Sequence, residues 1–152
     1  MEDKIRGFSP DEVVELYHYL CVYESELKRV ENLEIFKTKY PRLNTPLETL
    51  MGTLICNECN IETLSYVGIV PMDNLVSMTY TKGSKLLSLL YHLRNSIAHG
   101  QIEQDSDYVF IIDYKIDYKS GKSVKRFSAR GKVKSSTLFK IIDIINKDIN
   151  LT

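Results

Sequence analysis

The sequence predicts a mainly α fold: a compact helical bundle with a β-hairpin of two or three strands inserted before the last helix. Three observations support this class. Apolar residues recur at three- and four-residue steps in separate segments before residue 100. A run rich in β-branched and aromatic residues, YVFIIDYKIDY, follows, and a second run returns after a glycine turn. Helical spacing then resumes in TLFKIIDIINKDI, so the β-element precedes the final helix.

The first helix is predicted to begin after Ser9. The segment SPDE combines an N-cap serine, Pro10 at the first helical position and Glu12 completing a capping box. We expect one helix through the segment that ends at Glu34. Its apolar positions follow at helical spacing: Val13, Leu16, Leu20, Tyr23, Leu27 and Val30.

The second helix repeats this pattern, with Thr45 as the cap, Pro46 next and Glu48 three residues after the cap. The segment KYPRLN between the two helices is predicted to be a loop that Pro41 helps to end. The apolar face of the second helix is expected to contain Leu47, Leu50, Leu54 and Ile61.

The third helix is predicted to start at a cap formed by Asp73 or Asn74 and to run to about Ile97. Gly83 within it weakens the first half by roughly 1 kcal/mol relative to alanine. Gly100 is expected just past the end, in the left-handed conformation. The second half carries one apolar stripe: Leu86, Leu89, Leu90, Leu93 and Ile97.

The remaining elements are a hairpin and a final helix. The hairpin is predicted to turn around Gly121 in KSGK. Ser135 or Ser136 is expected to cap the last helix. The buried side of that helix is predicted to contain Leu138, Ile141, Ile142 and Ile145.

Composition predicts one globular domain over residues 1–152, because 43% of the residues are hydrophobic and 26% are charged. No apolar run approaches the roughly 18 residues that span a bilayer. The start, MEDKIRGFSPDE, lacks the apolar core of a signal peptide. We therefore expect a cytoplasmic protein with no membrane partner.

The charges cancel over the chain, with twenty basic and twenty acidic residues. They are not evenly distributed, since residues 111–134 contain eight basic residues and two aspartates. Such a segment can attract phosphates. A solvated face of a sheet is the simpler interpretation.

The cysteines offer one metal-binding alternative. Cys56 and Cys59 form a CxxC pair, and His18 with Cys21 forms a matching HxxC pair, so four ligands for zinc are available in principle. Both pairs fall in predicted helices without the glycine-containing turn that presents thiolates. Buried thiols are the preferred interpretation, with no metal and no cofactor.

The end of the third helix, LLYHLRNSIAHG, combines a leucine stripe with polar residues. If Leu93 points into the core, Asn95 and His99 lie one turn apart on a polar face, with His92 a turn further back. Arg94 and His99 are about 140° apart on a regular helix. They can meet only if the last turn loosens or a second copy of the helix supplies the partner. A structural role also remains open, in which basic residues complement the helix dipole.

The segment RNSIAHG resembles the motif of the HEPN superfamily (higher eukaryotes and prokaryotes nucleotide-binding domains), an arginine and a histidine separated by four to six residues. Asn95 directly after the arginine and the small-residue–His–Gly ending also match. The resemblance is sharp over residues 86–101 and architectural elsewhere. The hairpin and terminal helix are similar to the plasmid- and defence-associated bacterial branch, which implies a HEPN-like helical bundle.

The resemblance implies a metal-independent endoribonuclease, of the toxin or antiviral-defence type, that cleaves RNA as a homodimer. His99 would be the acid or base, Arg94 the phosphate clamp and Asn95 the orienting group. The residue types suit this reaction, since histidine titrates near neutral pH and arginine offers a planar fork of donors. One chain supplies one motif histidine, and two chains about a twofold axis supply an acid and a base.

Several alternatives remain open at this point. His92 is a weaker catalytic candidate, for which a solvated or core-edge histidine is preferred. Lys125, Arg126 and Arg130 of the hairpin are candidates for guiding RNA, or form a solvated strand face. The other function classes are a non-catalytic HEPN-like module that binds RNA or nucleotide, and an interaction partner such as an antitoxin or regulatory subunit. The corresponding partners would be a cognate antitoxin or a nucleotidyltransferase.

Overall fold

The computed structural model of the chain describes residues 5–61 and 73–149. Within these ranges the helical elements are α1 (Pro10–Val22), the π-helical segment η1 (Tyr23–Leu27), α2 (Leu33–Lys39), α3 (Pro41–Met51), α5 (Lys85–Ala98) and α6 (Ser135–Asp148). The strands are β1 (Ile55–Glu58), β2 (Leu75–Met78), β3 (Ile102–Asp105), β4 (Tyr108–Lys119) and β5 (Lys122–Lys134).

The strands form one five-stranded sheet in the order β1-β2-β5-β4-β3. β1 and β2 are parallel, and the other neighbours are antiparallel. The predicted mainly α bundle with an inserted hairpin is therefore wrong. The hairpin exists as β4 and β5, which turn at Gly121 with φ +75°. However, both strands pair with further strands, so they form the interior of a mixed sheet and not an insertion into a bundle.

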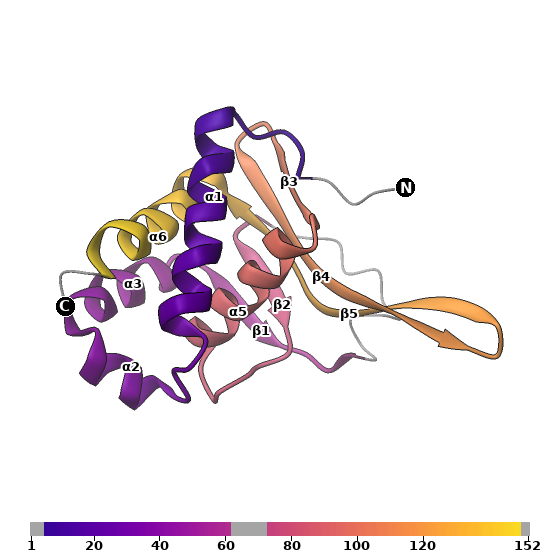
Figure 1. Cartoon of the computed structure of the whole chain (residues 1–152), viewed down its shortest axis with the longest axis horizontal. Coiled ribbons are helices and arrows are strands. Elements are labelled where there is room, and N and C mark those ends of the chain that lie inside the picture. The colour runs from indigo at the N-terminus through magenta and orange to yellow at the C-terminus, as the bar shows by residue number, and fades with distance from the viewer. Residues whose placement is uncertain (1–4, 62–72, 150–152) are drawn as a thin grey trace.

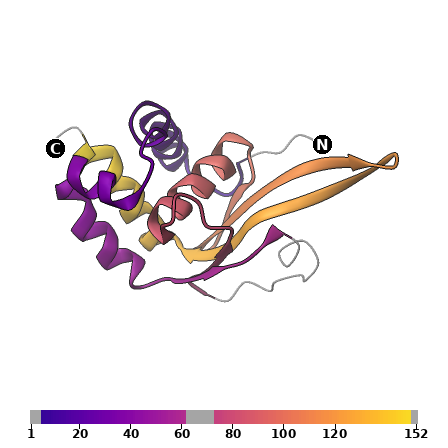
Figure 2. The same ribbon diagram turned by 90° about the horizontal axis from the view of Figure 1, so that it is seen from below.

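The helices and the sheet form two layers. Figures 1 and 2 show α1, α5 and α6 packed together on one side of the sheet, and the distal half of β4 and β5 extending away as a two-stranded arm. The apolar stripes predicted for the third and last helices are buried in this core. Leu89, Leu93, Ile141 and Ile145 are all fully buried.

The start of the first helix is confirmed. The Ser9 side chain accepts from Glu12 N, and the Glu12 carboxylate accepts from Ser9 N, which completes the capping box. A single helix extending to Glu34 is wrong, because α1 ends at Val22 and continues as η1. Asn32 then caps the separate helix α2. In this π-helical segment Lys28 N donates to Tyr23 O, five residues back, so the side chains beyond it leave the α-helical spacing.

The second predicted helix starts too late and runs too far. α3 begins at Pro41, where the proline occupies the first helical position, so KYPRLN is not a loop and Pro46 lies inside the helix. The helix ends at Met51, and Cys56 lies on strand β1. Four-residue strands such as β1 are too short for strand alternation to be distinguished from a helical pattern.

The third predicted helix also starts later than expected. Its first ten predicted residues form β2 and a turn instead. All four residues of β2 are buried, so the segment lacks the alternation of apolar and polar residues that would have indicated a strand. Asn74 is not a helix cap; its side chain accepts from Lys134 N. Ser84 caps α5 by accepting from Leu87 N, and Gly83 lies in the preceding turn with φ +65°.

The final helix α6 begins at Ser135. The predicted caps Ser135 and Ser136 are wrong, because the cap position is Lys134 and no side chain caps this helix end. Among the residues that the structure describes, no helix is long and apolar enough to span a membrane.

Candidate functional site

α5 carries the residues of the RNSIAHG segment. The helix is regular to Ala98 and ends in a Schellman motif, in which Gly100 N donates to Ile97 O and Gln101 N donates to Ser96 O. Gly100 adopts φ +65°, as the sequence predicts. Because the last turn does not loosen, the regular helix keeps Arg94 and His99 on different faces.

The three motif residues differ in burial. Asn95 is buried, the Arg94 side chain is 27% exposed, and His99 is exposed at the C-cap. Within residues 5–61 and 73–149 the His99 side chain makes no hydrogen bond or ion pair. The structure therefore brings Arg94 and Asn95 together and leaves His99 apart from them in a single chain.

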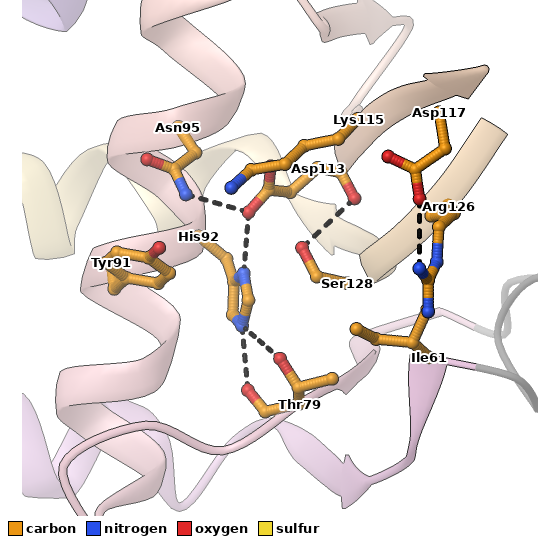
Figure 3. A pocket seen from close by; sticks show the side chains of 10 residues that line it. All are labelled: Ile61, Thr79, Tyr91, His92, Asn95, Asp113, Lys115, Asp117, Arg126 and Ser128. Carbon is orange, nitrogen blue, oxygen red and sulfur yellow. Dashed lines mark hydrogen bonds and ion pairs between the residues drawn. The ribbon is translucent and has the colours of Figure 1, made fainter.

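His92 is fully buried between α5 and the sheet (Figure 3). Its Nδ1 lies 2.8 Å from Asp113 Oδ2, and its Nε2 lies 2.7 Å from the carbonyl oxygen of Thr79. Asn95 Nδ2 donates to the same Asp113 oxygen at 2.9 Å. The preferred solvated or core-edge histidine is therefore wrong: His92 is part of a buried hydrogen-bond network.

This network holds the His92 ring in one orientation. The ring lies between the Asp113 carboxylate at Nδ1 and the carbonyl oxygen of Thr79 at Nε2. Burial raises the pKa of Asp113, but hydrogen bonds from His92, Asn95 and Ser128 outweigh burial and hold this pKa below its usual value.

Arg94 extends from the network toward the surface. Its Nη1 donates to Asn95 Oδ1 at 2.8 Å, and its Nε donates to the Glu24 carboxylate of η1. Partial burial raises the pKa of Glu24, but hydrogen bonds from Arg94 and Lys28 outweigh burial and hold this pKa below its usual value. A continuous chain of hydrogen bonds therefore links Glu24, Arg94, Asn95 and Asp113, and orients the guanidinium.

A cavity of about 360 Å³ opens beside the network. His92 and Asn95 line it from α5, together with Tyr91, and Figure 3 shows Lys115 and Arg126 entering from β4 and β5. Its volume lies within the usual range of roughly 300–1,000 Å³ for small-molecule pockets.

The predicted RNA-binding cations are divided between the two faces of the hairpin. Arg126 faces the α5 side, where it lines the cavity and pairs with Asp117 at 2.9 Å. Lys125 and Arg130 face the opposite side and lie over aromatic rings, 4.7 Å from the Tyr114 centroid and 4.1 Å from the Phe127 centroid. The three cations do not form one continuous patch.

A β-bulge produces this division. Asp113 pairs with Ala129 and Tyr114 pairs with Phe127, so Ser128 is an extra residue in β5. Simple alternation would place Arg126 and Arg130 on one face and Lys125 on the other. The extra residue reverses the faces beyond it, so sequence alternation alone misassigns the distal half of β5.

The described structure does not bring the residues of the alternative zinc site together as a metal-binding group. In the described parts of the chain no group of three or more His, Cys, Asp or Glu side chains could hold a metal ion. Cys21 is exposed, and Cys56 and Cys59 are half-buried. The interpretation of all three as buried thiols is therefore wrong for Cys21.

Glu24, Thr79 and Asp113 were not predicted to be site residues. Glu24 is separated from Arg94 by 70 residues, and Asp113 from His92 by 21 residues. Neither pair has a local spacing pattern that could reveal it. The only available signal for Asp113 is an acidic residue within an otherwise apolar strand segment, VFIID.

The comparison with protein families assigns the chain to a class. The family described as HEPN pEK499 p136 matches residues 15–147, from α1 into α6. The chain belongs to this HEPN family, which confirms the resemblance drawn from the sequence at the level of the superfamily. This membership indicates a nucleotide-binding or ribonuclease-like module. Searches of curated proteins and of solved structures found no match.

Proposed function

We propose that this protein is a metal-independent endoribonuclease whose active site forms between two copies of the chain. The observation that carries the proposal is the state of the motif at the end of α5. Arg94 is oriented by Asn95 and Glu24 and is partly exposed, while His99 is exposed at the helix end. A second copy can supply what one chain lacks, because a twofold axis beside the helix ends would bring two His99 side chains together.

The reaction assigns a role to each residue. One His99 accepts the proton of a 2′-hydroxyl, whose oxygen attacks the adjacent phosphorus, and the P–O5′ bond breaks. The other His99 donates a proton to the leaving O5′, so the products are a 2′,3′-cyclic phosphate and a 5′-hydroxyl. Arg94 stabilises the additional negative charge on the phosphorus oxygens.

The structure refines the role proposed for Asn95. Its amide group donates to Asp113 and its oxygen accepts from Arg94. Asn95 is therefore proposed as a positioning residue that orients the guanidinium. Asp113, itself bonded to His92, in turn holds Asn95, so the buried network helps to position Arg94.

Incubation of the purified protein with mixed RNA in EDTA tests this function. We expect fragments that end in 2′,3′-cyclic phosphate. His99→Ala and Arg94→Ala should each lower the rate by at least about a hundredfold, as loss of an acid/base group or charge clamp does. His18→Ala removes an exposed histidine of α1 and serves as the matched control. Cleavage that requires added metal would contradict the proposal.

Mixed dimers test the composite site. His99→Ala subunits re-equilibrated in excess with wild-type subunits should reduce the activity per wild-type chain toward zero, because one histidine of each pair is missing. If wild-type chains keep their full rate in mixed dimers, each chain contains a complete site and the composite arrangement is wrong.

One observation favours a second candidate function. Glu24 already pairs with Arg94 within one chain, which leaves the guanidinium less available to a reacting phosphate. A non-catalytic module that binds RNA or nucleotide fits this state. It predicts saturable RNA binding without any fragments in the same assay.

A further inference from the structure

A second cavity lies between η1 and α5, and it shares Tyr91 and Asn95 with the cavity beside His92. Its volume is about 280 Å³, near the small end of ligand pockets. The cations Lys28, Lys82 and Arg94 line it together with the single carboxylate of Glu24. The remaining lining residues are Tyr23, Tyr91 and Asn95. Three positive charges against one negative charge leave this cavity with an excess of positive charge.

The charged side chains of this cavity hold one another in place through hydrogen bonds and ion pairs. Lys28 Nζ lies 3.2 Å from Glu24 Oε2, and Arg94 donates to the other oxygen of the same carboxylate. Lys82 Nζ donates to the backbone carbonyl of Lys28 at 3.0 Å. Glu24 is thus the acceptor that two of the three cations share. A phosphate group offers the same kind of charged oxygen acceptors, in larger number.

The backbone of Lys82 adds an independent observation. Lys82 has φ +57° in the turn from Thr81 to Ser84, and the next residue, Gly83, has φ +65°. Such turns favour glycine, asparagine or aspartate at both positions, and a lysine there is strained. Burial also lowers the pKa of Lys82. Backbone strain and partial desolvation of an ammonium group both occur at ligand sites.

We infer that this cavity binds a phosphate group of a nucleotide or RNA chain through Arg94, Lys28 and Lys82, and that Glu24 occupies the phosphate position until the ligand displaces it. The inference rests on the proposed role of Arg94 as a phosphate clamp. It adds two binding residues and a competing carboxylate, which offsets part of the positive charge of the site when no ligand is bound.

Binding of three probes tests the inference: inorganic phosphate, AMP and a labelled single-stranded RNA decamer, each titrated at low salt. Lys82→Gly removes the ammonium group and suits the backbone conformation, so the variant should fold with an unchanged or raised Tm. It should weaken binding of the phosphate-bearing probes by about tenfold, the effect of one charged hydrogen bond. Lys85→Ala, three residues away and outside this cavity, should change binding by less than about twofold.

The opposite change is expected at Glu24. Glu24→Gln keeps the shape of the side chain and removes the competing charge, so binding should tighten by about tenfold. A response with AMP and phosphate identifies a free nucleotide as sufficient, and a response with RNA alone identifies a phosphodiester of the chain. Weaker binding in Glu24→Gln, or unchanged binding of all probes in Lys82→Gly, overturns the inference.

The RNA cleavage assay separates this inference from the proposed function. If the Lys82 and Glu24 variants change affinity but no RNA fragments form, the nuclease proposal is wrong and the phosphate site is supported. Fragments that depend on His99, with affinities unaffected by Lys82→Gly and Glu24→Gln, support the nuclease and overturn the phosphate site.

Discussion

The middle and the end of α5 each present a histidine, and the two side chains differ in burial and in hydrogen bonding. His92 is fully buried, with both ring nitrogens bonded to acceptors on neighbouring segments. His99 is exposed at the helix C-cap. A helical wheel places both on the same polar face. The difference arises from the surroundings, because β4 and the residue after β2 lie against the middle of the helix, whereas the Schellman motif ends it at His99.

This comparison separates two uses of one residue type. A buried imidazole that is hydrogen-bonded at both ring nitrogens is suited to holding other groups in place. An exposed histidine side chain can contact a ligand and is suited to proton transfer. The middle of α5 is therefore suited to positioning and its end to the chemistry of the proposed function.

The largest expected effect concerns the stability of the middle of the helix. His92→Ala leaves the Asp113 carboxylate buried without its nearest partner and should lower the free energy of unfolding by about 3–5 kcal/mol. His99→Ala, at an exposed position, should change it by less than about 0.5 kcal/mol. Urea unfolding followed by circular dichroism measures both. Similar losses in the two variants would contradict the division of roles.

A smaller effect is expected at Asn95, which connects the two regions. Asn95→Ala removes a donor to Asp113 and an acceptor for Arg94, and should cost about 1–3 kcal/mol. The same urea titration measures it. In combination with His92→Ala the losses should not add, because both residues bond to one Asp113 oxygen. Additive losses would show that the network is not coupled.

Acid should weaken the middle of the helix selectively. The pKa of Asp113 is lowered from 3.8 in the folded protein, so its contribution to stability is present above pH 3.8 and is lost as the pH falls through the folded pKa. Unfolding midpoints measured from pH 6 down to pH 2 should show this loss in the wild type. Asp113→Asn should be less stable at pH 6 and should lose less on acidification. A parallel decline of both proteins would assign acid sensitivity to other groups.

The smallest effect is expected at the hairpin, whose cations contact half-buried partners. Charge reversal of Lys125, Arg126 and Arg130 together should weaken RNA binding and reduce the slope of log affinity against log salt by at most about 3. Because these residues lie on two faces, one RNA strand should not contact all of them, and a reduction near 1 or 2 is expected. Fluorescence anisotropy over a salt series measures the slope. An unchanged slope would show a purely solvated surface.

Local patterns in the sequence predicted the elements that depend on neighbours in the chain. The capping box of Ser9 and Glu12, the apolar stripe of α5 and the turn at Gly121 all act within a few residues. The sheet could not be predicted in the same way. β2 is four buried residues, and its antiparallel partner β5 lies about fifty residues further along the chain.

The same limit applies to the site. Arg94, Asn95 and His99 were identified because they lie in one short segment with a recognisable spacing. Glu24 and Asp113, which fix the orientation of Arg94 and Asn95, are distant in sequence and belong to other elements. Their contribution depends on how η1 and β4 pack against α5, and packing of distant segments leaves no periodic pattern in a single sequence.

The bulge at Ser128 also affects the direction of the arm. β5 has 13 residues and β4 has 12, and the extra residue bends its strand and increases the local twist. Deleting Ser128 would leave the pairs Asp113–Ala129 and Tyr114–Phe127 intact, so every distal side chain would keep its face. The direction of the arm would change, and the Ser128 carbonyl that accepts from Thr79 N would be lost. The direction of the arm therefore depends on this one residue, whereas the charges that the arm carries depend on the side chains along it.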